Sequence, residues 1–328
     1  MEEKLDLKDK KILYELDKNS RLTLSEIGKK VRLSKETVFH RINKLIEKGF
    51  ILRFQTVIST YRLGYQSYKI YFKLQNMTQE TRSKIQDFFM KNKMVYWIGN
   101  CQGRWDLIIA FWTKNLQEFG KFEDEILNKF SNFIQEKEVS ISRKSIQFNR
   151  NWFYSKDEPR IETDFGEELG ETKLDKIDLE ILKYLANNAR IKIVDLAEKI
   201  GVSVTVIRYR LKQLEKNKVI LGYKYALNPK LLNYETCKSF INFKNITSEK
   251  RKQLIDYCKM NQKIVNIVLT IGSWNMEIEF EVRNFDEYYK IMNDIQEKHN
   301  DIIRNYESIL FSSEPKQSFM PYAYQVIE

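Results

Sequence analysis

The side chains best suited to recognition chemistry lie in two short segments, 34–48 and 203–218, which carry hydrogen-bond donors at helical spacing. Lysine, arginine, threonine and asparagine can grip phosphates or read base edges in a duplex groove. The donors of the two segments are Lys35, Thr37, His40, Asn43 and Lys44, then Thr205, Arg208, Tyr209 and Lys212. Arg41 and Arg210 share one position beside the apolar stripe, where each can reach phosphate or pack locally. We therefore predict two surfaces that contact double-stranded DNA.

Each of these surfaces belongs to a set of three short helices. Asp6 is an N-cap residue type that begins the first predicted helix, and Thr23 with Glu26 forms a capping box for the second. Ser34 caps the third helix, and the range 51–58 follows as a strand. The apolar stripe of the third helix is Val38, Ile42 and Leu45. A tight turn before the third helix predicts a helix-turn-helix whose outer face is free for the major groove.

The chain contains an internal duplication. Sliding the sequence by 169 residues aligns 5–54 with 174–223 without a gap, and 14 of these 50 positions are identical, where chance gives about three. Near the carboxyl ends of the two copies we expect the register to slip, so that 146–148 matches 309–311. A whole structural unit is therefore repeated, and the repeat is not a short solenoid motif.

Charge and composition narrow the function further. The net charge of +11 suits a polyanionic partner, because lysine and arginine contacts to phosphate release condensed counterions. The three cysteines show no CxxC spacing and the only histidines are His40 and His299, so we predict no metal site, no catalytic residues and no cofactor. No apolar run approaches the roughly 20 residues of a membrane span. A cytoplasmic protein without membrane contact is expected.

The hundred residues after each helix-turn-helix predict a ferredoxin-like sandwich. In the first copy the expected strands are 68–74, 95–98, 105–111 and 139–148, and the expected helices are 78–90 and 116–130. The order β-α-β-β-α-β corresponds to a four-stranded antiparallel sheet with helices on one face. The other face needs a cover, for which a sheet from the second copy or from another chain is the natural candidate. The fold class is thus α+β, with the winged helix-turn-helix and the sandwich both present twice.

The order of these elements resembles the Lrp/AsnC family of leucine-responsive and feast/famine regulators. The matching residues are Leu5, Asp6, Asp9, Ile12, Leu13, Arg21, Leu33, Ser34, Arg41, Ile42, Leu45, Gly49, Phe50, Ile51, Gly64 and the turn Gly103-Arg104-Trp105-Asp106. Each of the two copies resembles a family member, and together the copies make up nearly the whole chain. The resemblance implies a transcription regulator whose sandwich domains pair and can bind an amino acid or a related metabolite.

In that family the turn between the second and third sandwich strands lies close to the effector. Carried over, the effector residues are Gly103 and Asp106 in the first copy, and Gly272 and Asn275 in the second. Asn275 replaces the aspartate of the family pattern, which removes a charge that would hold an ammonium group. A plain β-turn without a ligand is the alternative interpretation of these residues.

The predicted domains are 1–60 and 174–229 for DNA binding, 61–154 and 230–328 for effector binding or assembly, and 155–173 as an acidic linker. The linker carries seven acidic and three basic residues together with Pro159, Gly166 and Gly170. Two fused units predict a pseudo-dimer within one chain, and whole chains can assemble further. Two other functions stay open at this point: a sirohaem-decarboxylase-like enzyme, which shares this architecture, and an assembly protein that does not bind DNA.

Overall fold

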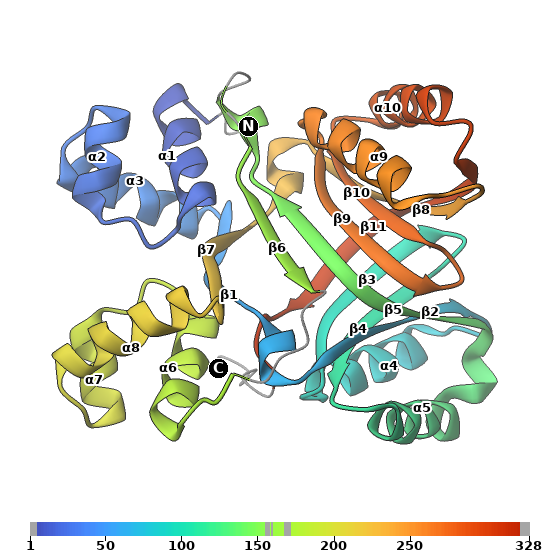
Figure 1. The fold of residues 1–328 in the computed structure, drawn as a ribbon, viewed down its shortest axis with the longest axis horizontal. Helices are drawn as coiled ribbons and strands as arrows, with labels where there is room; N and C mark the ends of the chain where they lie inside the picture. Colours follow the sequence, from blue (N-terminus) through green and yellow to red (C-terminus); the bar gives the residue numbers. More distant parts are fainter. Residues whose placement is uncertain (1–4, 155–157, 159, 167–171, 322–328) are drawn as a thin grey trace.

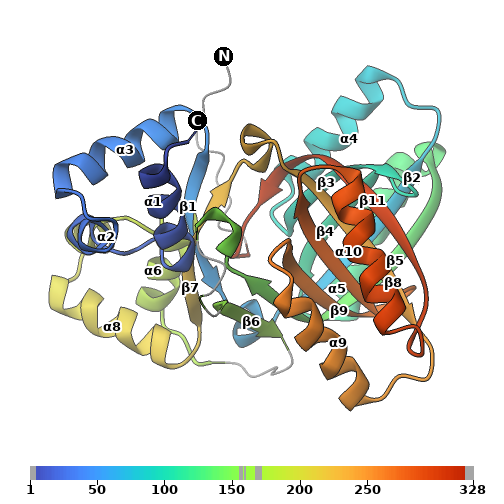
Figure 2. The same ribbon diagram turned by 90° about the horizontal axis from the view of Figure 1, so that it is seen from above.

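The structure of the chain is a computed structural model that describes residues 5–154, 158, 160–166 and 172–321. Parts of the predicted linker, including Pro159 and Gly170, lie outside the described residues. The two helical heads occupy one end of the molecule, and a large β-structure flanked by α4, α5, α9 and α10 occupies the other (Figure 1). Figure 2 shows the same separation from above.

Each head is built from the three predicted helices. In the first head these are α1 (Leu7–Lys18), α2 (Leu24–Val31) and α3 (Lys35–Glu47), and in the second α6 (Lys176–Asn187), α7 (Ile193–Ile200) and α8 (Val204–Lys216). The predicted caps are confirmed: Asp6 accepts from the Asp9 amide, Thr23 forms a capping box with Glu26, and Ser34 accepts from the Thr37 amide. These caps satisfy amides that a helix start leaves without partners, so local sequence sets where each helix begins.

An antiparallel two-stranded ribbon joins the two heads. Its strands are β1 (Ile51–Ile58) and β7 (Ile220–Leu227). Ile51 pairs with Leu227, and Ile58 pairs with Ile220. Because the duplication places Ile51 in the position of Ile220 and Ile58 in that of Leu227, the two pairs exchange under the 169-residue offset. An approximate twofold axis therefore runs through the middle of the ribbon, as the predicted pseudo-dimer requires.

The predicted sandwiches are both present. The first contains β2 (Gln66–Leu74), α4 (Gln79–Lys91), β3 (Val95–Gly103), β4 (Leu107–Thr113), α5 (Leu116–Phe130) and β5 (Ile134–Phe148). The second contains β8 (Glu235–Phe243), α9 (Ser248–Met260), β9 (Ile264–Gly272), β10 (Met276–Val282), α10 (Phe285–Lys298) and β11 (Ile303–Gln317). Short 3-10 turns lie at Thr60–Leu63, Ser131–Phe133, Asn151–Phe153 and Pro229–Leu232. The strand orders β5-β2-β4-β3 and β11-β8-β10-β9 are those of a ferredoxin-like sheet.

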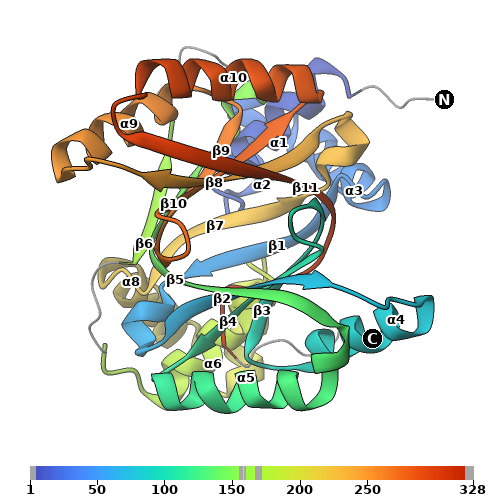
Figure 3. The ribbon, with the colours of Figure 1, turned by 90° about the vertical axis from the view of Figure 1, so that its right-hand side faces the viewer.

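The two sheets join edge to edge into one closed barrel. β3 pairs with β11 and β9 pairs with β5, both antiparallel, so each sheet edge meets an edge of the other copy. Helices α4 and α5 cover one side of the barrel and α9 and α10 the opposite side (Figure 3). Of the two covers that the sequence left open for the free sheet face, a second copy or another chain, the structure shows the sheet of the second copy. Closure also leaves these edges without exposed backbone groups.

Two sequence-based expectations are corrected by the strands. The register does not slip at the carboxyl ends: β5 and β11 are related by the same offset of 169 as the other strands, so 309–311 corresponds to 140–142 rather than to 146–148. The segment predicted as an acidic linker also contains regular structure, because its strand β6 (Glu162–Gly166) pairs antiparallel with the end of β5.

The barrel interior differs between the copies. Strand β4 of the first copy, with the sequence LIIAFWT, carries no charged residue. In its counterpart β10, apolar residues that face the helices alternate with three glutamates, Glu277, Glu279 and Glu281. Aromatic side chains fill one part of the interior, among them Tyr71, Trp105 and Trp274. The sheet face that copy two turns inward is therefore strongly charged, and those charges need partners within the barrel.

Among the described residues, no helix has the length and apolar character that crossing a bilayer demands.

Candidate nucleic-acid interface

The predicted DNA-contacting donors lie on the outward faces of α3 and α8. The side chains of Lys35, His40, Lys44, Thr205, Arg208, Tyr209 and Lys212 are exposed, and those of Thr37 and Asn43 are half-buried. The stripes of Val38, Ile42 and Leu45, and of Ile207, Leu211 and Leu214, are buried against α1, α2 and their counterparts. Apolar periodicity thus turns the donor-bearing face of each third helix away from its head's core.

Arg41 and Arg210 face the first helix of their own head. The Arg41 guanidinium lies 2.7 Å from carboxylate oxygens of both Asp6 and Asp9. Arg210 repeats the contact at 2.8 Å from Asp175 and 3.3 Å from Asp178. Hydrogen bonds to Asp6 and Asp9 raise the pKa of Arg41 above its usual value. The sequence allowed two roles for these arginines, contact with phosphate or local packing. Their contacts serve local packing, because they link the third helix of each head to the start of its first helix.

The outer face of α8 carries a row of cations. Arg208, Lys212 and Lys216 follow one another at four-residue spacing, so their side chains lie on one side of the helix, and all three are exposed. The equivalent row of α3 is Phe39, Asn43 and Glu47, which carries no positive charge. Lys216 was not among the predicted contact residues. Comparing the two copies position by position along 39–47 and 208–216 would have revealed it.

In the first head the cations gather instead at the turn before α3. Ser25, Gly28, Lys29, Arg32, Leu33, Ser34 and Lys35 line a shallow depression there. Arg32 holds a left-handed backbone conformation with φ +56°, which a side-chain-bearing residue adopts at a cost. The same position in the second head is Gly201, while Glu198 replaces Lys29. The sequence interpretation missed Lys29 and Arg32 because it considered only the third helix.

The predicted effector residues lie at the turns after β3 and β9. Asp106 accepts a hydrogen bond from the Leu74 amide at 2.8 Å, and Asn275 accepts the equivalent bond from the Phe243 amide at 2.8 Å. Since an amide oxygen serves as well as a carboxylate for this bond, the aspartate-to-asparagine exchange leaves the turn intact. Both side chains therefore stabilise the turn itself through these hydrogen bonds, as expected for a plain β-turn without a ligand.

Gly103 and Gly272 lie at the two seams of the barrel. A Cβ atom on Gly272 would come within 2.5 Å of the Val139 carbonyl oxygen, and φ is +141°. At Gly103 the nearest atom is the Ser308 carbonyl oxygen at 3.1 Å, with φ +123°. Close approach of the two sheets accounts for a glycine at these positions without any ligand.

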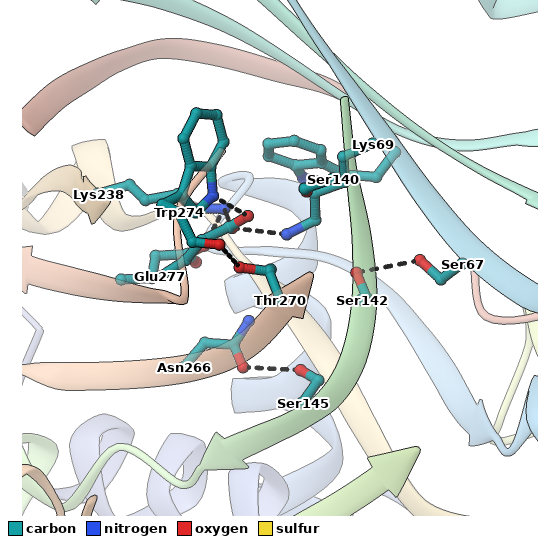
Figure 4. A network of polar contacts seen from close by, with 12 residues as sticks. Ser67, Lys69, Ser140, Ser142, Ser145, Lys238, Asn266, Thr270, Trp274 and Glu277 are labelled. Carbon is teal, nitrogen blue, oxygen red and sulfur yellow. Dashed lines mark hydrogen bonds and ion pairs between the residues drawn. The ribbon is translucent and has the colours of Figure 1, made fainter. Parts of the chain in front are cut away.

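Inside the barrel, the charges of β10 meet lysines from both copies. Lys69 of β2 lies 2.6 Å from Glu277, and the equivalent Lys238 of β8 lies 3.1 Å from the same carboxylate (Figure 4). Burial alone would raise the pKa of Glu277, but the two ammonium groups outweigh it and hold the pKa at about 2. The Trp274 indole and the Tyr71 hydroxyl also donate to this carboxylate. Glu277 is thus a fully satisfied centre that ties the two sheets together.

A cavity of about 190 Å³ lies between the barrel and the β1–β7 ribbon. Its walls include Arg53 of β1, Tyr225 of β7, Lys238 of β8 and Glu279 of β10. Beside the cavity, the Arg150 side chain links the first head to the barrel. It donates to the Asp17 carboxylate of α1 at 3.0 Å and to the Glu281 carboxylate of β10 at 2.7–2.9 Å. Among the described residues, no three histidine, cysteine, aspartate or glutamate side chains are grouped to hold a metal ion.

The geometry defines a two-headed winged helix-turn-helix protein built on a closed barrel. A family model described as a winged helix-turn-helix DNA-binding domain matches residues 5–51 and again 174–220. The leucine-responsive regulatory protein of Haemophilus influenzae is 48% identical over 60 residues, which cover 18% of this chain and 36% of that protein. An uncharacterized HTH-type transcriptional regulator of Pyrococcus furiosus is 30% identical over 132 residues, covering 39% of this chain and 87% of that protein.

The chain therefore belongs to the Lrp/AsnC family of HTH-type transcriptional regulators. Over its whole length its fold is similar to the crystal structure of the siroheme decarboxylase NirDL, with a TM-score of 0.64 and 13% identity. That alignment covers 96% of this chain and 94% of the other, so the tandem arrangement of two units is shared. At this identity the likeness concerns the fold alone.

Proposed function

We propose that this chain regulates transcription by binding duplex DNA through two heads that make different contacts. The row Arg208, Lys212 and Lys216 carries the proposal, because three exposed cations on one face of a third helix suit the phosphates and base edges of a major groove. In the first head, the cations Lys29, Arg32 and Lys35 flank the turn and suit the DNA backbone. The second head therefore supplies cations along its helix and the first supplies them at its turn.

Because the heads are fused and related by a twofold axis, we expect a site with two half-sites about 34–36 Å apart, or one helical turn. The half-sites differ in sequence, since the outer faces of α3 and α8 share few residue types. Holding both heads in one chain also raises the effective concentration of the second head once the first is bound. The preferred operator is thus an imperfect palindrome.

The test is selection of duplexes from a random library, followed by affinity measurements at several salt concentrations. The parent protein should prefer the selected duplex over a scrambled one. Arg208→Ala should weaken binding about fivefold or more, whereas Lys290→Ala, on the exposed face of α10 in the barrel domain, should leave affinity unchanged. Failure of the parent to retain any duplex at low salt would refute the proposal and leave the DNA-silent assembly protein as the better interpretation.

We also propose that the chain is not a sirohaem decarboxylase, although the fold is similar. A tetrapyrrole substrate of that enzyme class carries carboxylates, which need cations or histidines to receive them. His40 lies on α3 of a head and His299 at the end of α10, and neither lines the cavity. Cations do line it, but Lys69 and Lys238 are paired with Glu277 and Arg150 with Glu281, so these three already hold carboxylates of the protein. A tetrapyrrole absorbance band that titrates to one equivalent per chain would overturn this conclusion.

An amino-acid effector at Gly103, Asp106, Gly272 and Asn275 stays a prediction, as does assembly of whole chains. Action on DNA implies a cytoplasmic location. Equilibrium dialysis with pooled labelled amino acids, and light scattering of the purified chain, test the first two points directly.

A further inference from the structure

One large apolar side chain lies among the polar residues on the outer face of α3. Phe39 is 47% exposed and, within the part of the chain that the structure describes, it belongs to no buried apolar cluster. It follows Lys35 by four residues and precedes Asn43 by four, so the three side chains form one row along the helix. Single exposed apolar residues are common on protein surfaces, so exposure alone assigns no role to Phe39. Its place between a cation and an amide, on the face proposed to meet DNA, does.

The orientation of the Phe39 ring is supported by the next residue. The ring meets the His40 imidazole edge to face, with ring centroids 5.7 Å apart and an angle of 68° between the planes. His40 is itself exposed, so the contact orders two rings at the surface without burying either of them. The phenyl ring therefore stays accessible to a partner that approaches α3 from outside.

The second head carries an arginine at the same position. Under the offset of 169 residues, Phe39 corresponds to Arg208 of α8. Arg210 is held by two carboxylates at the start of α6, whereas no carboxylate in the described ranges pairs with the exposed Arg208. Because an approximate twofold axis relates the heads, Phe39 and Arg208 face equivalent base pairs in the two half-sites of a duplex.

These two side chains recognise different bases. A phenyl ring makes apolar contact with the C5-methyl group of thymine, which is the apolar group that the major groove presents. An arginine donates two hydrogen bonds to O6 and N7 of guanine. The next position of each row follows the same division, because the amide of Asn43 suits adenine and the ammonium group of Lys212 suits guanine. The first head thus carries side chains that suit A·T pairs where the second carries side chains that suit G·C pairs.

We propose that Phe39 and Arg208 specify different bases at the same position of the two half-sites. Phe39 contacts the methyl group of a thymine in one half-site, and Arg208 donates to a guanine in the other. This inference rests on the proposed binding of duplex DNA and adds to it the identity of two bases. The departure of the operator from a palindrome therefore has a defined form, with an A·T pair under the first head and a G·C pair under the second.

Base analogues in the duplex obtained by library selection test the contact of Phe39. Replacing thymidine by deoxyuridine removes only the methyl group, and the replacement is made in one half-site at a time. In one of the two half-sites it should weaken binding of the full chain about fourfold, the factor expected when one methyl-sized group loses its burial. Phe39→Ala should bind both duplexes equally. Phe285→Ala, which changes an exposed phenylalanine of α10, should keep the parental difference.

Two results separate this inference from the proposed function. If the parent binds the selected duplex but does not distinguish thymidine from deoxyuridine in either half-site, or if Phe39→Ala keeps the difference, the assignment of Phe39 is overturned and the regulator proposal stands. If the parent binds no duplex at all, both are overturned. The analogue comparison on the parent protein needs no variant, so it stays decisive even where a variant fails to fold.

The contact of Arg208 is tested in the other half-site. There, 7-deazaguanine replaces the N7 acceptor by a C–H group and should weaken binding of the parent about fivefold or more, but should not affect Arg208→Ala. Library selection with Phe39→Arg gives the complementary test, since guanine should then appear at the equivalent position of both half-sites and make the operator more symmetric. An operator identical to that of the parent would refute the inference.

Discussion

Arg21 and Arg190 make the same contact in opposite directions between the two heads. The Arg21 guanidinium donates to the Ile191 carbonyl at 3.3 Å, and the Arg190 guanidinium donates to the Leu22 carbonyl at 3.0 Å. Each also donates a shorter bond to the carbonyl two residues earlier. Since the two arginines are equivalent under the duplication, this reciprocal clamp fixes the orientation of the heads about the twofold axis.

Removing one side of the clamp should therefore loosen both heads. We expect Arg21→Ala to lower the free energy of unfolding by about 1–3 kcal/mol, because two carbonyls lose a charged donor. Affinity for a duplex with two half-sites should fall more than affinity for a single half-site. Urea unfolding followed by circular dichroism, and binding to both duplexes, measure these effects. Arg190→Ala is the matched variant, and losses that differ severalfold between the two would contradict reciprocity.

The cations at the turn of the first head should contribute phosphate contacts. Arg32→Gly removes a charge without backbone strain, since φ is +56° and the equivalent residue of the second head is glycine. Combined with Lys29→Ala, it should reduce the slope of log affinity against log salt by about two, at roughly 0.9 per phosphate contact. The control is Lys199→Ala on α7, for which an unchanged slope is expected. A double variant with the parental slope would exclude this turn from the interface.

The barrel seam should not tolerate a side chain at Gly272. With a carbonyl oxygen 2.5 Å from the new Cβ and φ +141°, Gly272→Ala should destabilise the protein by about 2–4 kcal/mol. Gly120, in the middle of α5, has no atom within 4 Å of the corresponding position, so Gly120→Ala should stabilise by about 0.5–1 kcal/mol. Thermal denaturation of both variants gives the comparison. Equal melting temperatures would mean that the seam is looser than the structure indicates.

The buried Glu277 makes stability depend on pH at the acid end. Its pKa is about 2 when folded against an ordinary value of 4.5, so the folded state favours the ionised form. The stabilisation is complete above pH 4.5 and is lost as the pH falls from 4.5 toward 2. It amounts to about 3 kcal/mol. Chemical denaturation between pH 3 and 6 should show this loss in the parent but not in Glu277→Gln, which is less stable at pH 6. Parallel pH profiles of the two proteins would contradict the charge assignment.

The helix boundaries of the heads could be predicted because their causes are local. Asp6, Thr23 and Ser34 each cap a helix within three residues, and the buried stripe of the third helix follows directly from residue spacing. The duplication was visible for the same reason, as a constant offset of 169 residues between similar stretches. The fold class and the outward-facing donors of α3 and α8 followed from these patterns, and the family followed from the resemblance of the ordered residues to Lrp/AsnC regulators.

The contact partners of individual side chains were decided by tertiary structure. In β10, apolar residues alternate with Glu277, Glu279 and Glu281, and closure of the barrel turns the glutamate face inward. Arg41 and Arg210 look like any other cation on a helix until the start of the first helix brings two carboxylates to each. Spacing along the chain specifies which face of its element a residue occupies. The residues that cover that face are distant in sequence, by 32 positions for Asp9 and Arg41 and by 208 for Lys69 and Glu277, so only the tertiary structure identifies them.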